Sequence, residues 1–286
     1  MSVQVYRSAL MTSALRLDRF YRGIPLPADV HFIDLEDGVP TTAKTLARNN
    51  FLSLAPRVFP CSFGVRVNSL RSASGLDDVA AFIESTIDPD VILLPKVETP
   101  DEVQLYDSWM TAAGKSGELW ALIETVQGFR NIYEIAESTP RLTTLNFGVA
   151  DYAAEMGASM EWEAMLNARS RVVEAARATQ RLAVDSPTLD LRDSDSLRSD
   201  AERAYKLGFS GKVVIHPDQL SIVNSSFAHS IELIEWARKV LSKLDVSPQS
   251  IDTVDGQMVG PPFVRKARDI LNATPLGLGR IVESAP

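Results

Sequence analysis

The chain has 286 residues and a formal net charge of −8, with 37 acidic against 29 basic side chains. It lacks the excess of basic residues that binding to a nucleic-acid backbone requires, so we expect no nucleic-acid partner. Cys61 is the single cysteine, which excludes an intrachain disulfide and favours a reducing, cytoplasmic setting. We expect no secretory signal and no membrane association, because no segment reaches the about 18–20 apolar residues of a membrane span.

Eight short apolar runs recur along the chain and predict eight strands. They lie at 6–12, 30–37, 63–68, 91–97, 119–125, 145–151, 182–187 and 212–217. Most are nearly continuous in Val, Ile, Leu and Phe, which is typical of parallel strands buried on both faces. Alternating strands and helices predict an α/β protein with a (β/α)8 TIM barrel. An open doubly wound sheet is the alternative, but it usually has fewer strands and no G-x-G-x-x-G follows the first run.

Helix signals stand between these runs. The threonines at 41–42 are expected to cap the helix that follows the second strand. Thr99 is the expected N-cap of a helix that begins at Pro100 and stops near Gly114. The longest amphipathic helix is expected within 161–180.

The last part of the chain predicts a C-terminal helical extension. The polar stretch 190–204 is expected to be a loop that enters a capped helix. Two further helices are expected near 218–243 and 263–272, with a loop at 247–262 between them. We therefore assign 1–246 to the barrel and 247–286 to a C-terminal loop and helix that packs on a neighbouring subunit.

Polar side chains stand where the predicted strands end, which in this fold is the face that carries the active site. They are Arg7, Asp34, Glu36, Asp37, Arg66, Asn68, Lys96, Glu98, Glu124, Asp151, Asp185 and His216. Burying so many carboxylates without a counter-charge is costly, and a divalent cation removes that cost.

Glu124 and Asp151 end neighbouring strands and are the candidate metal ligands. Oxygen ligands without a Cys–His cluster favour Mg²⁺ (or Mn²⁺) over Zn²⁺. The alternative is that each carboxylate only caps the helix after it.

Three cations of this ring, Arg66, Lys96 and Arg7, are assigned to substrate binding. The Arg66 guanidinium can hold a carboxylate or enolate oxygen in a fork, although an internal ion pair with Glu36 or Glu124 is the alternative. Lys96 is expected to pair with a strand-end acid. A Schiff-base role for it is less favoured, because acidic neighbours do not depress a lysine pKa.

Ten motifs carry a resemblance to a known family. They are YRSAL (6–10), FIDLEDGVP…K…AR (32–48), VRVNS (65–69), LLPKVE (93–98), LIET…G (122–128), NFGVADYAAEMGA (146–158), ARSRVVEAARA (168–178), VDSPTLDLRD (184–193), AYKLGFSGKVVIHPDQ (204–219) and DGQM (255–258). In this order they resemble the HpcH/HpaI aldolase and citrate lyase β-subunit family, in its branch of malyl-CoA and citramalyl-CoA lyases.

The resemblance implies a TIM barrel, usually a homotrimer or hexamer. It implies a Mg²⁺-dependent carbon–carbon lyase that acts through a metal-bound enolate on a hydroxy-acyl-CoA or hydroxy-oxo-acid substrate. Glu124 and Asp151 match the metal ligands, and Arg66 matches the substrate-binding arginine. Glu36 and Asp37 match residues that hold metal-bound waters and shape the pocket, and we assign them with Arg66 as catalytic.

Three departures from the family pattern bear on function. Ser13 and Ala14 stand where the family has Pro-Gly, and Ala150 stands where it has an acid. Gly260, in GQMVGPP, takes the place of an aspartate that a neighbouring subunit contributes as acid/base. The alternatives are therefore an acyl-CoA thioester hydrolase, a CoA-independent 2-oxo-acid aldolase, and a non-catalytic subunit.

Overall fold

The computed structural model describes residues 5–54, 60–244 and 251–273. These residues form two compact units, one over Tyr6–Phe227 and a smaller one that includes Val5 and the chain from Ala228 onward. In these described ranges, no helix has the length and apolar character needed to cross a membrane.

The larger unit is a closed barrel of eight parallel strands in chain order, with β1 paired to both β2 and β8. The strands are β1 (Ser8–Ser13), β2 (Val30–Asp34), β3 (Ser62–Arg66), β4 (Val91–Leu94), β5 (Glu118–Ile123), β6 (Leu142–Phe147), β7 (Leu182–Asp185) and β8 (Gly211–Val214). The TIM barrel prediction is confirmed.

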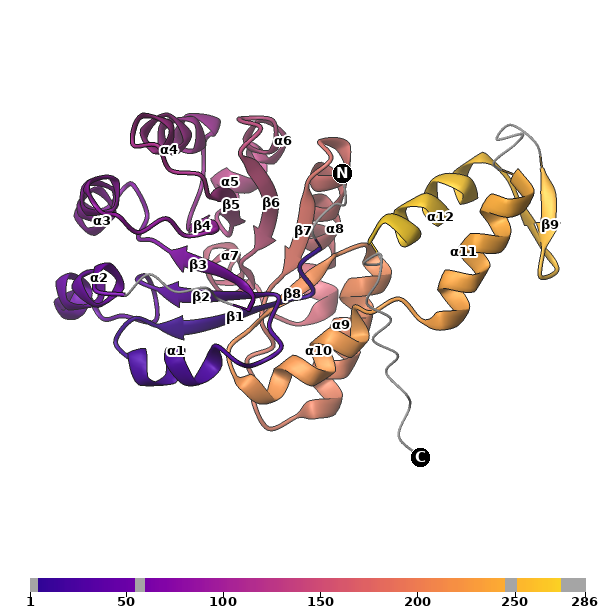
Figure 1. Cartoon of the computed structure of the whole chain (residues 1–286), viewed down its shortest axis with the longest axis horizontal. Helices are drawn as coiled ribbons and strands as arrows, with labels where there is room; N and C mark the ends of the chain where they lie inside the picture. The colour runs from indigo at the N-terminus through magenta and orange to yellow at the C-terminus, as the bar shows by residue number, and fades with distance from the viewer. Residues whose placement is uncertain (1–4, 55–59, 245–250, 274–286) are drawn as a thin grey trace. The chain divides into compact units, whose positions relative to one another are not determined.

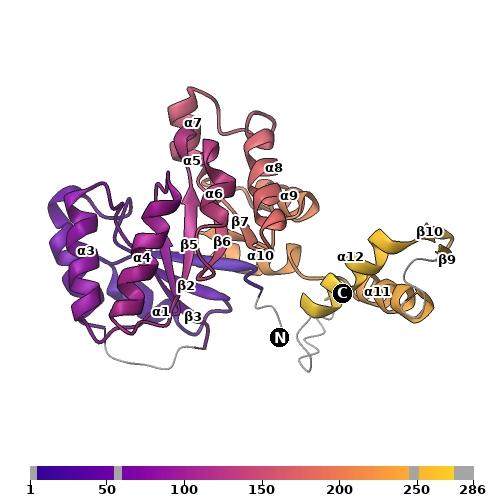
Figure 2. The same cartoon turned by 90° about the horizontal axis from the view of Figure 1, so that it is seen from above.

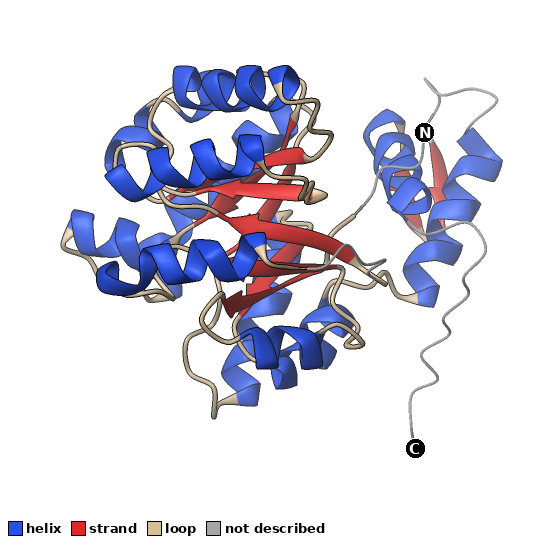
Figure 3. Ribbon diagram, turned by 60° about the vertical axis from the view of Figure 1, so that its left-hand side comes forward, coloured by secondary structure: helices blue, strands red, loops and turns tan. Residues whose placement is uncertain are grey.

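Helices cover the outside of the barrel, as Figures 1 and 3 show. They are α1 (Leu17–Gly23), α2 (Lys44–Leu52), α3 (Ala73–Glu84), α4 (Pro100–Ala112), α5 (Val126–Arg130), α6 (Ile132–Ala136), α7 (Val149–Met156), α8 (Trp162–Ala178), α9 (Ser194–Leu207) and α10 (Leu220–Ser226). The 310 turns η1 (Thr41–Ala43) and η2 (Pro217–Gln219) precede α2 and α10.

Side chains alternate along each strand between the barrel interior and the helix layer. Phe32 and Trp120 pack inside the barrel, with ring centroids 5.3 Å apart. Gly64 lies against the Phe32 ring, where a Cβ atom would come within 2.4 Å of it. Ile33 and Ile123 face outward and join the larger core under the helices. The interior is filled with side chains, so chemistry is confined to the carboxyl end of the strands.

Most helix signals act as the sequence predicts. A capping box of Thr99 and Glu102 starts α4, with Pro100 at its first position. Asp193 caps α9 by accepting the backbone N–H of Ser196. The prediction of threonine caps for α2 is wrong, because Thr41 lies in the 310 turn and no side chain caps the helix. The expected helix near 218–243 is also wrong as a single element, since it divides into α10 and α11 (Ile231–Leu244).

The smaller unit holds α11, the hairpin β9 (Asp252–Val254) and β10 (Gln257–Val259), and α12 (Pro261–Ala273). The two helices lie side by side in Figures 1 and 2 and share an apolar core. The predicted loop at 247–262 is wrong where the hairpin forms. Asp255 and Gly256 both have positive φ, as a tight two-residue hairpin turn requires. The unit begins at Ala228, whereas the sequence assigned α11 to the barrel; its packing on a neighbouring subunit stays a prediction.

Candidate active site

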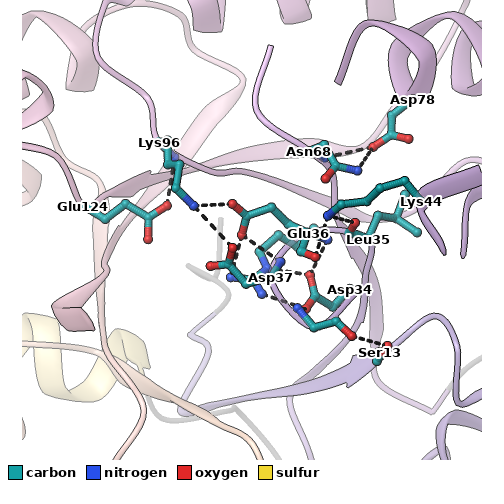
Figure 4. Close-up of polar contacts among 12 residues, drawn as sticks. Ser13, Asp34, Leu35, Glu36, Asp37, Lys44, Asn68, Asp78, Lys96 and Glu124 are labelled. Carbon is teal, nitrogen blue, oxygen red and sulfur yellow. Dashed lines mark hydrogen bonds and ion pairs between the residues drawn. The ribbon is translucent and has the colours of Figure 1, made fainter. Parts of the chain in front are cut away.

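Five charged side chains meet at the carboxyl end of the barrel: Arg66, Glu36, Lys96, Glu124 and Asp151. They come from the ends of β2 to β6, and Figure 4 shows Lys96 pointing toward Glu36 and Asp37, with Glu124 on its other side. Strand alternation places Glu36, Arg66 and Glu124 on the inner face, since they continue the inward positions of β2, β3 and β5. Lys96 reaches the cluster through a residue with positive φ, and Asp151 from the first turn of a helix.

Asp34 binds the guanidinium of Arg66 and orients it. The Nε and Nη2 of Arg66 donate to the two Asp34 carboxylate oxygens, each at 2.7 Å, and its Nη1 lies 3.2 Å from Glu36 Oε2. These residues face each other because Asp34 and Arg66 are register partners on adjacent strands. Burial alone raises the pKa of Asp34, but the charge and hydrogen bonds of Arg66 lower it overall. Asp34 therefore stays ionised and fixes the direction of the guanidinium.

The loop after β2 is tied down on several sides. Asp34 accepts the backbone N–H groups of Glu36 and Gly38 at 2.9 and 2.8 Å. Lys44 Nζ donates to the carbonyl oxygens of Leu35 and Glu36 at 2.9 and 2.7 Å. Ser13 Oγ, at the end of β1, donates to the Gly38 carbonyl at 2.7 Å. This loop presents Glu36 and Asp37 in a fixed conformation.

Glu124 is buried, with 3% of its surface exposed. Its Oε1 accepts the backbone N–H of Lys96 at 3.0 Å. Gly148 lies against it, and a Cβ atom there would come within 2.4 Å of Glu124 Oε2. Burial raises the pKa of Glu124 well above its ordinary value, and the negative charges of Glu36 and Asp151 raise it further. The positive charges of Lys96 and Arg66 do not offset this rise in the pKa of Glu124.

Asp151 lies in the first turn of α7, and its side chain is 41% exposed. Its Oδ2 is 3.5 Å from Lys96 Nζ. The start of α7 is fixed by Ser186, whose Oγ donates to the Phe147 carbonyl at 2.6 Å and accepts the Val149 N–H at 2.9 Å. Asp151 is thus the accessible acid of the cluster and Glu124 the buried one.

The oxygen donors of this cluster fit a magnesium ion. Among the described residues, no group of three or more His, Cys, Asp or Glu side chains forms a ready metal site. Magnesium does not need one, because it typically binds one or two carboxylates and completes its shell with water and substrate oxygens. The like charges that raise the pKa of Glu124 are those a divalent cation would neutralise. Glu124 and Asp151 are the pair that would hold it.

Several predicted residues lie outside the cluster. Arg7 precedes β1 at the amino end of the barrel, where its Nε and Nη2 bind Asp29 at 2.9 and 2.8 Å. It lies at the end of the barrel opposite the cluster, so its assignment to substrate binding was wrong. The strand begins after Arg7, which therefore marks its start rather than its end.

Other polar residues at strand ends have structural partners. Asn68 donates to the buried Asp78, and Glu98 pairs with Arg71. Asp185 faces the helix layer, where it binds Arg169 Nε at 3.0 Å and Lys212 Nζ at 2.7 Å. His216 Nδ1 accepts the Asp218 N–H at 3.3 Å in an exposed turn.

The sequence does not predict the roles of two residues that shape the site. Asp34 is among the predicted strand-end acids, but the expected ion-pair partners of Arg66 are Glu36 or Glu124. The structure shows the pair with Glu36 and adds the fork with Asp34. The two-residue spacing from Asp34 to Glu36 places both on the inner face and was a usable signal. Gly148 gave no comparable signal, since only the structure shows that the space beside it belongs to Glu124.

Comparisons with known proteins agree with this geometry. Residues 24–217 match the family model described as HpcH/HpaI aldolase/citrate lyase. A (3S)-malyl-CoA thioesterase from Cereibacter sphaeroides is 33% identical over 93% of both chains. A mitochondrial citramalyl-CoA lyase from Rattus norvegicus is 30% identical over 87% of this chain and 80% of its own. The crystal structure of CitE from Mycobacterium tuberculosis, in complex with magnesium, acetoacetate and coenzyme A, matches with a TM-score of 0.78 and 30% identity, over 94% of this chain and 98% of that one.

Proposed function

Because this chain belongs to the HpcH/HpaI aldolase/citrate lyase family, we propose that it is a Mg²⁺-dependent carbon–carbon lyase acting on a 3-hydroxy-acyl-CoA. Relatives named as lyases of citramalyl-CoA and of malyl-CoA support a hydroxy-dicarboxylic thioester as the substrate class. The observation that carries the proposal is the meeting of Glu124 and Asp151 around Lys96, with Arg66 beside them.

The reaction requires a proton to leave and a carbon–carbon bond to break. A base takes the proton of the substrate hydroxyl, which becomes the carbonyl of a 2-oxo acid. The bond to the thioester α-carbon breaks, and its electron pair passes into a thioester enolate, which a proton then converts to the released acyl-CoA. When bound, Mg²⁺ would supply positive charge near the oxygens on which negative charge develops.

The side chains of this chain divide the remaining work. Arg66, oriented by Asp34, binds a substrate carboxylate or oxo group through the part of its guanidinium that Asp34 does not use. Asp37 is 58% exposed and is the acid that reaches substrate for proton transfer. Glu36 is buried between Arg66 and Lys96 and holds both cations in place.

Product analysis tests this function. Full-length protein is incubated with malyl-CoA and with citramalyl-CoA, with Mg²⁺ or with EDTA, and the products are identified by NMR. We expect an oxo acid and acetyl-CoA with Mg²⁺, and no reaction with EDTA or in Glu124→Gln. Glu98→Gln, which changes a strand-end acid outside the cluster, should remain active. Cleavage that ignores EDTA would refute the metal-dependent mechanism.

Thioester hydrolysis is the second candidate. It is favoured by the match of malyl-CoA thioesterases over 93% of both chains, and by Gly260 in place of the family aspartate. In this reaction water attacks the thioester carbonyl, the C–S bond breaks and CoA leaves as the thiol. Free CoA and an intact hydroxy acid in the same NMR assay would establish it over the lyase.

We infer further that the protein is a cytoplasmic homo-oligomer, a trimer or a hexamer. The family resemblance supports the oligomer, and so does the smaller unit, where Ile251 and Met258 are 68% and 71% exposed. The single cysteine, Cys61, supports the cytoplasmic location. Light scattering of the purified chain measures the number of subunits, and a monomer at micromolar concentration would rule the oligomer out.

A further inference from the structure

Lys96 occupies the centre of the acidic cluster and has an unusual backbone. Lys96 follows β4 and has a φ of +52°, in the left-handed region that residues other than glycine and asparagine seldom adopt. In that conformation its backbone N–H points to Glu124 Oε1, 3.0 Å away. The main chain of Lys96 therefore binds one proposed metal ligand.

The side chain of Lys96 binds the other acids. Its Nζ forms an ion pair with Glu36 Oε1 and lies 3.5 Å from both Asp37 Oδ1 and Asp151 Oδ2. Burial alone lowers the pKa of Lys96, but the carboxylates of Glu124 and Glu36 raise it overall, so the amine is a cation. One positive charge thus contacts acids of the loop after β2 and of the first turn of α7.

The other cations near this cluster are committed elsewhere. Arg66 is bound in a fork by Asp34, and Lys44 donates to two backbone carbonyls. Neither has an ion pair with Asp151 among the contacts of the described residues. Lys96 is thus the cation that shares Asp151 with an incoming metal ion.

We propose that Lys96 is a built-in competitor of the metal ion: its ammonium neutralises the acids of the site and weakens Mg²⁺ binding by occupying Asp151. This rests on the proposed metal site of Glu124 and Asp151. A divalent cation at Asp151 would be repelled by an ammonium a few ångströms away. When Mg²⁺ binds, the ammonium moves away from Asp151 and keeps its ion pairs with Glu36 and Asp37. Lys96 would then be a positioning residue that sets metal affinity, rather than a Schiff-base nucleophile.

Calorimetric titration of the full-length chain with MgCl2 at fixed pH and ionic strength tests the proposal. Lys96→Asn removes the charge and keeps a residue that tolerates positive φ. We expect its Kd for Mg²⁺ to fall at least tenfold, which equals about 1.4 kcal/mol, and its metal-free melting temperature to fall because the acids repel one another. Lys96→Arg keeps the charge and should bind Mg²⁺ as the original protein does.

Controls separate this proposal from the metal site itself. Lys206→Gln removes one charge from the exposed face of α9 and should leave the Kd unchanged. If Lys96→Asn does not fold, Lys96→Gly takes its place, since glycine adopts positive φ freely. If the Kd of Lys96→Asn (or of Lys96→Gly) for Mg²⁺ is unchanged or higher than that of the original protein, Lys96 does not compete with the metal ion. Full Mg²⁺ binding by Glu124→Gln would instead overturn the metal site on which the proposal rests.

Discussion

At the scale of single residues, the site depends on buried carboxylates whose partners differ. Asp34 has Arg66 in a fork and two backbone N–H groups, so it is stable as an anion. Glu124 has one backbone N–H and lies near the acids Glu36 and Asp151, which disfavour its charge. This contrast separates an acid that orients a side chain from one suited to bind a cation.

Two glycines allow these carboxylates to lie where they do, and their replacement tests the two roles. In Gly148→Ala the new Cβ would lie 2.4 Å from Glu124 Oε2, so the carboxylate must move. We expect Mg²⁺ affinity to fall at least tenfold in calorimetry. Gly38→Ala is the matched control, because its Cβ would strike Asp34 Oδ2 at the same distance. Gly38→Ala should lower the free energy of unfolding but keep more of the Mg²⁺ affinity than Gly148→Ala does. If both variants lose the same affinity, Glu124 and Asp34 do not have separate roles.

His31 makes stability depend on pH. It is buried against Phe20, its Nε2 contacts Thr12 Oγ1 at 2.9 Å, and burial lowers its pKa to about 4. The unfolded chain binds this proton near pH 6.5, so between pH 6.5 and 4 the unfolded state holds more protons than the folded one. The contribution of His31 to the free energy of unfolding is therefore fully present above pH 6.5. It decreases as the pH falls from 6.5 to 4, by about 3 kcal/mol at most.

Urea unfolding at pH 7 and at pH 4.5 measures this loss. His31→Gln should lose less stability between the two values than the original protein, whereas the exposed His216→Gln should not differ from it. An equal loss in His31→Gln would show that other groups cause the acid sensitivity.

At the scale of elements, the sequence predicted the eight strands, but only some of their polar ends reach the cluster. Continuous apolar runs identify buried parallel strands, and the fold places whatever follows them on one face. Glu124, Asp151 and Arg66 could be placed at the carboxyl end of the barrel for this reason. Arg7 could not be placed from the pattern, because an apolar run does not reveal that the strand starts only at Ser8. The positive φ of Lys96 and the space beside Gly148 arise from contacts between distant segments, which no local pattern encodes.

Ser186, which directly follows β7, fixes the start of α7, the helix that carries Asp151. Ser186→Ala would leave the buried Val149 N–H without its acceptor and the Phe147 carbonyl without its donor. We expect the free energy of unfolding in urea to fall by about 1–3 kcal/mol. Ser170→Ala removes a hydroxyl from the exposed face of α8 and should change it little. If both variants are equally stable, Ser186 does not hold the helix.

At the scale of the whole molecule, the chain joins a barrel that carries the site to a smaller helical unit that carries Gly260. Gly260 lies between the hairpin and α12. The family resemblance puts an acid/base aspartate of a neighbouring subunit at this position. In the proposed function, proton transfer then falls to the barrel, where the side chain of Asp37 is 58% exposed.

Restoring that acid tests whether the smaller unit takes part in catalysis. We expect Gly260→Asp to raise kcat for malyl-CoA cleavage at least tenfold, within the range for an added general acid or base. Asp37→Asn should lower kcat in the original chain and have less effect in Gly260→Asp. No gain from the added aspartate would place all acid/base chemistry in the barrel.

The proposed mechanism requires that Glu124 and Asp151 hold one divalent ion at the carboxyl end of the barrel. Diffraction from crystals grown with Mn²⁺ tests it most directly, through the anomalous signal of the metal. We predict one peak per chain, about 2.0–2.3 Å from a carboxylate oxygen of each residue, as expected for a small hard cation with oxygen ligands. A peak elsewhere, or no peak when both carboxylates are ordered, would rule out this metal site.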